Sequence, residues 1–190
     1  MSEEKKKDVA ADPSLNDRLM KTRSIMLTGE ISKESADVVI RNLLVMDSES
    51  NEPITVYINS PGGDVDAGFA IFDTVRFISS PVTMVGMGLV ASAAVIVLLA
   101  VPAERRIGLP HSSYLIHQPM ASMKGVATDI AIHARNMEHC RALTDELIAS
   151  SCGKSVEEVR KDTERDYWLY STQAIEYGLI SRVIETRTEL

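Results

Sequence analysis

Short apolar runs alternate along the chain with longer segments whose apolar residues recur at helical spacing. The short runs predict strands over residues 24–27, 54–58, 82–88 and 114–116. The periodic segments predict helices over residues 32–46, 64–78 and 128–151, and capping residues predict shorter helices starting at Ser155 and over 171–178. Such alternation is typical of crossover units on a mostly parallel sheet, so we expect an α/β fold.

The longest uncharged run covers residues 82–102 and is long enough to span a bilayer. Its glycines instead predict a buried strand over 82–88 and, after it, a helix over 91–101 that is apolar on every face. Ser92 then lies at a strand-to-helix turn, where unpaired backbone N–H groups favour an oxyanion. The alternative is a buried hydroxyl that bonds a backbone carbonyl.

Two further segments end in residues suited to acyl transfer. The strand over 54–58 stops at Asn59-Ser-Pro-Gly-Gly63, a loop that brings bare backbone close to a ligand, so Gly63 is a candidate oxyanion donor. His117 follows the strand over 114–116, at the strand end where open α/β sheets bind ligands. His117 is therefore the candidate base, and a purely structural histidine is the alternative.

The chain has 190 residues, of which 45% are hydrophobic and 25% charged, enough for one sizeable core. We expect a flexible N-terminal segment over residues 1–16 and a single domain over 17–190. The opening residues are polar and of mixed charge, which is unlike a secretory signal and favours the cytoplasm.

The formal net charge of −7 gives no electrostatic reason to expect nucleic acid or an anionic membrane as a partner. Cys140 and Cys152 are the two cysteines of the chain, and they lack the spacing of a metal site. We therefore expect free thiols and no bound metal.

Five motifs in register resemble the Clp protease proteolytic subunit family, ClpP, over most of the chain from about Arg18 to Val183. They are Ile58-Asn-Ser-Pro-Gly-Gly63, Gly88-Leu-Val-Ala-Ser92, Leu109-Pro110 with Ile116-His-Gln-Pro119, Asp162-Thr-Glu-Arg-Asp166 and Glu176-Tyr-Gly-Leu-Ile180. The resemblance implies a serine endopeptidase with Ser92 as nucleophile, His117 as base and Asp166 as orienting acid. It also implies an oxyanion hole made by the backbone N–H groups of Gly63 and Ala93. Spacing alone does not single out Asp166.

The resemblance further implies stacked crossover units with a protruding strand-helix handle, assembled as two heptameric rings around a chamber. Arg165, flanked by Glu164, is then expected at the contact between the rings. The family takes unfolded polypeptides from an AAA+ unfoldase such as ClpX, ClpA or ClpC, which uses the ATP, so no cofactor is expected in this chain. The family's docking pocket for the unfoldase maps to Tyr57, Phe77, Val85, Met87, Ile107 and Leu109.

Three segments depart from the usual family pattern. Ala93-Ala94 replaces the usual Met-Gly, Ala121-Ser122 replaces a glycine pair, and Met1 to Pro13 lacks the apolar and then charged opening. These departures leave open an alternative interpretation, in which the chain is a weakly active or regulatory paralogue that works in mixed rings. A crotonase-type acyl-CoA enzyme, which polarises a carbonyl with two N–H groups but needs no triad, is the other alternative.

Overall fold

A parallel sheet forms the centre of the chain in the computed structural model, which describes residues 13–190. Its strand order is β1-β2-β3-β4-β7, with each neighbouring pair parallel. The bounds are β1 Ser24–Thr28, β2 Ile54–Ser60, β3 Val82–Ala91, β4 Arg106–Gly108 and β7 Arg182–Val183. The expected α/β class with a mostly parallel sheet is therefore confirmed.

Strand β3 changes partner part-way along its length. Residues Met84 to Gly86 pair with β4, whereas Leu89 to Ala91 pair with β5, Ser113–Ile116. Between the two pairings lies Gly88, whose φ of +60° suits glycine. Strand β5 in turn pairs antiparallel with β6, Tyr167–Tyr170. As a result, the ends of β3 and β5 and the beginning of β6 come together.

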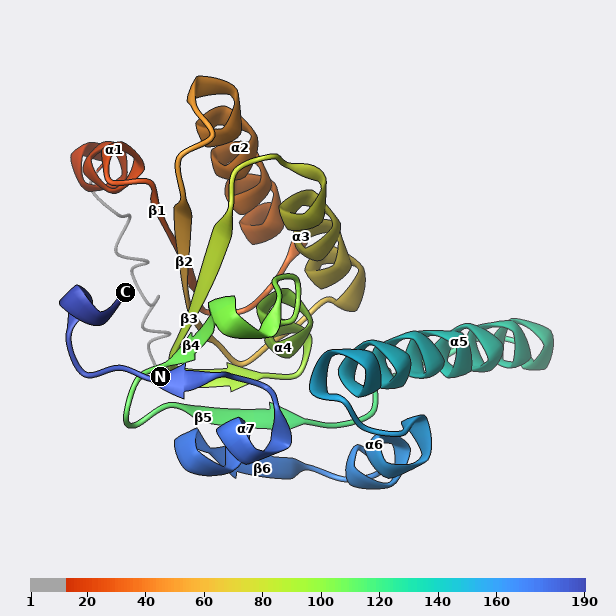
Figure 1. The fold of residues 1–190 in the computed structure, drawn as a ribbon. Helices are drawn as coiled ribbons and strands as arrows, with labels where there is room; N and C mark the ends of the chain where they lie inside the picture. Colours follow the sequence, from red (N-terminus) through yellow and green to blue (C-terminus); the bar gives the residue numbers. More distant parts are fainter. Residues whose placement is uncertain (1–12) are drawn as a thin grey trace, which may run out of the picture.

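Three helices cover one face of the central sheet (Figure 1): α2 Lys33–Glu49, α3 Val65–Phe77 and α4 Ala93–Leu98. Ser32 caps α2 and Asp64 caps α3, as the sequence predicts. Along β2, the side chains facing these helices are buried, and the alternate ones are half-buried or exposed. The opposite face of the sheet is therefore more open to solvent.

Helix α5, Ala127–Cys152, extends away from the body as a long arm (Figure 1). Its buried residues lie near its C-terminal end: Thr144, Asp145, Ile148 and Ala149. The segment that the resemblance assigns to the strand of the handle, Ala121 to Val126, forms no regular secondary structure and has no partner strand within residues 13–190. Helices α6 Val156–Asp162 and α7 Ser171–Tyr177 complete the C-terminal part.

The structure corrects two boundaries. Helix α1, Pro13–Lys21, begins inside the segment expected to be flexible, and the rest of that segment lies outside the described residues. The helix predicted over 91–101 spans only Ala93–Leu98: Ala91 still belongs to β3, and residues 99–101 form a turn and a bend before Pro102. Among the described residues, no helix is long and apolar enough to cross a membrane.

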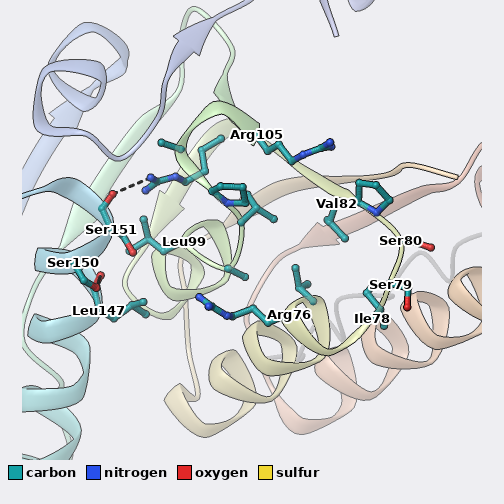
Figure 2. A pocket seen from close by; sticks show the side chains of 17 residues that line it. Arg76, Ile78, Ser79, Ser80, Val82, Leu99, Arg105, Leu147, Ser150 and Ser151 are labelled. Atoms are coloured by element: carbon teal, nitrogen blue, oxygen red, sulfur yellow. Dashed lines mark hydrogen bonds between the residues drawn. The ribbon is translucent and has the colours of Figure 1, made fainter. Parts of the chain in front are cut away.

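Buried Arg106 ties the ends of two helices to the sheet. Its guanidinium donates to Ser151 O at 2.9 Å, in the last turn of α5 (Figure 2). It also donates to Gly178 O at 3.2 Å, directly after α7. Helix C-termini leave carbonyls without intrahelical donors and favour a cation there. Burial removes water from the guanidinium and thereby lowers the pKa of Arg106. The two carbonyls replace part of the lost hydration.

Candidate active site

Ser92 lies in the tight turn between β3 and α4. Its φ of 55° and ψ of −123° are rare for a residue with a side chain and cost about 1–3 kcal/mol. Two backbone hydrogen bonds hold the turn: the Ser92 N–H donates to Leu115 O at 2.8 Å, and the Val95 N–H donates to Ser92 O at 2.9 Å. The strained turn is therefore fixed by both β5 and α4.

His117 lies between Ser92 and Asp166. Its Nε2 is 2.8 Å from Ser92 Oγ, and its Nδ1 is 3.2 Å from Asp166 Oδ1. His117 follows β5 and its side chain is 13% exposed, whereas Asp166 directly precedes β6 and is 63% exposed. With the proton on Nδ1, the ring donates to Asp166 and Nε2 is free to accept the serine proton. The structure thus brings together the three residues that the resemblance selects.

The loop Gly62-Gly63 packs directly against the serine turn. A Cβ on Gly62 would lie 2.5 Å from Ala91 O and 2.7 Å from Ser92 Cβ, so the loop leaves no room for a side chain there. The Ile31 N–H donates to Gly62 O, and the Asp64 N–H donates to Ile31 O, both at 2.8 Å. Sequence reasoning did not single out Gly62, although the Pro-Gly-Gly sequence was the available signal.

Two backbone donors flank the serine. Ala93 is the first residue of α4, so its N–H has no partner within the helix. The Gly63 N–H has no backbone acceptor among residues 13–190. A side chain is excluded at Gly63, because its φ is +147° and an added Cβ would collide with Ile31 O. Neither predicted oxyanion donor therefore has a backbone acceptor among the described residues.

Two hollows border His117, and the smaller of them also borders Ser92. A small one, of about 20 Å³, is lined mainly by apolar residues of α4, β5 and α5, with Val65 and Pro119. A wider one, of about 910 Å³, is also lined by His117 and reaches Asp166, Met120 and Met137. The nucleophile therefore faces a narrow apolar recess, and the base faces open space.

Another cavity, of about 740 Å³, lies away from these residues, between the end of α3, the segment after α4 and the end of α5 (Figure 2). Its lining includes Arg76, Arg105 and Arg106 but none of Ser92, His117 or Asp166. The carbonyls at two helix ends that Arg106 binds give this arginine a structural role. We therefore assign the chemistry to the two hollows that border His117.

The residues expected at a ring contact lie on the surface beside Asp166. Glu164 Oε2 accepts from Arg141 Nη2 of α5 at 2.7 Å, and this bond lowers the pKa of Glu164. Arg165 is exposed and forms no ion pair within the described part of the chain. In the single chain, Glu164 thus pairs with Arg141 of α5, and the side chain of Arg165 is left available for a contact with another subunit.

The six residues of the expected docking pocket divide into two groups. Tyr57, Val85 and Ile107 are register partners on adjacent strands, and Met87 and Leu109 follow two positions later on the same face. Phe77 ends α3, on the helix-covered side of the sheet, and is 82% exposed. Val85 and Ile107 are buried, which also fits an ordinary core role. Within one chain, five of the six residues lie on neighbouring strands, and Phe77 lies apart from them at the end of α3.

Comparison with known proteins decides the family. A family model described as Clp protease matches residues 6–187. The chain belongs to the Clp protease family. This Clp protease chain is 52% identical over 190 residues to ATP-dependent Clp protease proteolytic subunit 2 of Treponema denticola, covering 100% of the chain and 95% of that protein. It is 56% identical over 174 residues to the protein of the same description in Treponema pallidum, covering 91% and 87%.

A solved structure agrees with the family assignment. The Clp protease chain superposes on a ClpP1 mutant from Listeria monocytogenes with a TM-score of 0.86 and 41% identity, covering 92% of this chain and 98% of that one. The expected ClpP fold is therefore confirmed, and the chain is a Clp protease proteolytic subunit. No observation favours the crotonase-type alternative. The numbered description of the Treponema relatives, subunit 2, fits the suggestion of a paralogue.

Proposed function

We propose that this subunit is a serine endopeptidase in which Ser92, His117 and Asp166 act as nucleophile, base and orienting acid. The observation that carries the proposal is the continuous set of hydrogen-bonding distances, 3.2 Å from Asp166 to His117 and 2.8 Å from His117 to Ser92. A serine hydroxyl becomes a useful nucleophile only when an adjacent imidazole takes its proton.

In the proposed reaction, His117 Nε2 removes the proton from Ser92 Oγ as this oxygen attacks the scissile carbonyl carbon. The N–H groups of Gly63 and Ala93 bind the oxyanion that forms, and loss of one such donor typically lowers the rate by ~10²–10³. His117 then donates its proton to the leaving amine, and water releases the acyl group from Ser92. The recess beside Ser92 is lined mainly by apolar residues, which favours an apolar residue on the acyl side of the cleaved bond. At about 20 Å³ the recess must widen to admit such a side chain.

The assembly and partners are part of the same proposal. We infer two heptameric rings, built from this chain alone or with a paralogue, with Arg165 and Glu164 at the contact between rings. An AAA+ unfoldase supplies unfolded polypeptide and uses the ATP, so this chain binds no cofactor. Its apolar loop docks on Tyr57, Val85, Met87, Ile107 and Leu109, with Phe77 at the rim. The proposed compartment is the cytoplasm.

Hydrolysis of a short fluorogenic peptide tests the proposed chemistry. Ser92→Ala removes only the hydroxyl oxygen and should abolish turnover while the assembled size stays the same. Turnover that persists in this variant would rule out Ser92 as the nucleophile.

One observation favours the second candidate, a subunit that is weakly active alone and works in mixed rings. Asp166 is mostly exposed, so the acid that orients His117 lacks the shielding that strengthens a buried hydrogen bond. Peptidase activity measured alone and after mixing with a paralogous subunit separates the two: activity that appears only in the mixture supports the second candidate.

A further inference from the structure

Asp145 is a buried carboxylate that has no place in the proposed reaction. It lies in α5 near the body, and its side chain is only 2% exposed. An ionised group at such a depth is unfavourable unless hydrogen bonds and opposite charge surround it. Asp145 Oδ1 accepts from Thr163 Oγ1 at 2.9 Å, and Oδ2 lies 3.7 Å from Arg141 Nε.

The Thr163 bond is the better of these two contacts. The distance of 3.7 Å is an ion pair but too long for a hydrogen bond, and both Asp145 Oδ2 and Arg141 Nε are without hydrogen-bond partners among the described residues. A buried ion pair with incomplete hydrogen bonding adds little net stability. Stability alone is therefore a weak reason for a carboxylate at this position.

Thr163 begins the short segment that leads to Asp166. Thr163 O accepts from the Gln118 N–H at 2.7 Å, and Glu164 O accepts from Gln118 Nε2 at 2.8 Å. Gln118 directly follows His117, so these bonds tie the segment carrying the acid to the residue beside the base. One turn before Asp145 on α5, Arg141 holds Glu164. Two residues of α5 therefore bind two consecutive residues of the segment.

Asp166 itself has few restraints. Its side chain is 63% exposed, and among residues 13–190 its recorded hydrogen bond is the one to His117. The location of its carboxylate therefore depends on the backbone that leads to it, three residues beyond Thr163. A displacement of about 1 Å at an active site can lower a rate by about 10².

We propose that Asp145 is a positioning residue for the hydrolysis: by binding Thr163, it holds the segment that sets Asp166 against His117. The inference rests on the proposed serine peptidase function. Asp145 touches neither substrate nor reacting atoms, so it acts only through Thr163. The donor on Thr163 is a neutral hydroxyl, which needs an acceptor oxygen but no negative charge. The proposed role of Asp145 therefore depends on its oxygen and not on its charge.

Two pairs of variants test this role. Asp145→Ala removes the acceptor, whereas Asp145→Asn keeps a carbonyl oxygen that can accept from Thr163. Thr163→Val removes the donor at nearly constant volume, whereas Thr163→Ser keeps it. Glu146→Ala is the matched control, since Glu146 is the next residue of α5, is exposed and has no recorded hydrogen bond through its side chain in the described chain.

The measurements are kcat and KM for a short peptide and the rate at which a fluorophosphonate labels Ser92, with melting temperature and sedimentation recorded for each variant. Asp145→Ala and Thr163→Val should lower kcat and the labelling rate by about 10–10²-fold with little change in KM. Asp145→Asn and Thr163→Ser should recover most of that loss. Because both changes break one bond, the double variant Asp145→Ala with Thr163→Val should be no slower than either single variant.

Other results would overturn the proposal. Equal rates in Asp145→Ala and wild type would do so, as would an Asp145→Asn variant no faster than Asp145→Ala, or a loss that merely follows the folded or assembled fraction. If Asp145→Ala does not fold, the comparison of Thr163→Val with Thr163→Ser decides. Failure of the proposed function looks different, because the wild type itself would then not be labelled at Ser92.

Discussion

Gly62→Ala should damage both stability and catalysis, because its new methyl group has no free space. The Cβ would lie 2.5 Å from Ala91 O, 2.7 Å from Ser92 Cβ and 2.9 Å from Ala93 N. Two of these atoms are backbone, which no side-chain rotation can move. The φ of +89° adds about 1–2 kcal/mol for a residue with a side chain, and overpacking adds about 1–3 kcal/mol. We expect the free energy of unfolding to fall by roughly 2–5 kcal/mol.

Gly29→Ala separates the cost of the positive φ from the cost of overpacking. Gly29 has a similar φ of +78°, but nothing lies within 4 Å of an added Cβ. Urea unfolding should therefore show a loss of about 1–2 kcal/mol for Gly29→Ala and a larger loss for Gly62→Ala. Fluorophosphonate labelling should stay near the wild-type rate in Gly29→Ala and fall about 10²-fold in Gly62→Ala. Equal stability and equal labelling in the two variants would refute the close packing of this loop on the serine turn.

Two further predictions concern the buried arginine and assembly. Arg106→Met should lower the free energy of unfolding in urea by about 2–3 kcal/mol, since Gly178 O and Ser151 O lose their donor; no change would show that water replaces it. Arg165→Ala should shift sedimentation from two rings toward one and reduce peptidase activity, because a truncated interface charge pair costs ~2–5 kcal/mol; a fully active double ring would contradict this.

Local rules predicted most helices and long strands. Ser32, Asp64 and Ser155 cap the helices expected from them, since a cap depends only on a few consecutive residues. Strand β4 has only three residues, and its pairing depends on β3 and β7, which are distant in sequence. Its first residue, Arg106, is polar yet buried, because its partners are helix ends far along the chain. No local pattern reveals such contacts.

The site was also predictable only in part, because some of its contacts join residues that are distant in sequence. Ser92, Gly63 and His117 each stand at the end of a predicted strand, so position in the fold suggested them. Asp166 lies in an exposed segment among other charged residues, and only resemblance to the family singled it out. The bond between Asp145 and Thr163 joins α5 to the end of α6, and such a contact exists only once the helices have packed.

Mass spectrometry of the intact chain after fluorophosphonate treatment tests the central claim most directly. Only an activated serine beside a base and an oxyanion hole reacts readily with this reagent. The account predicts a single adduct, mapped by peptide sequencing to Ser92, and no adduct in His117→Ala. An adduct on another residue, or equally rapid labelling of Ser92 without His117, would contradict the account.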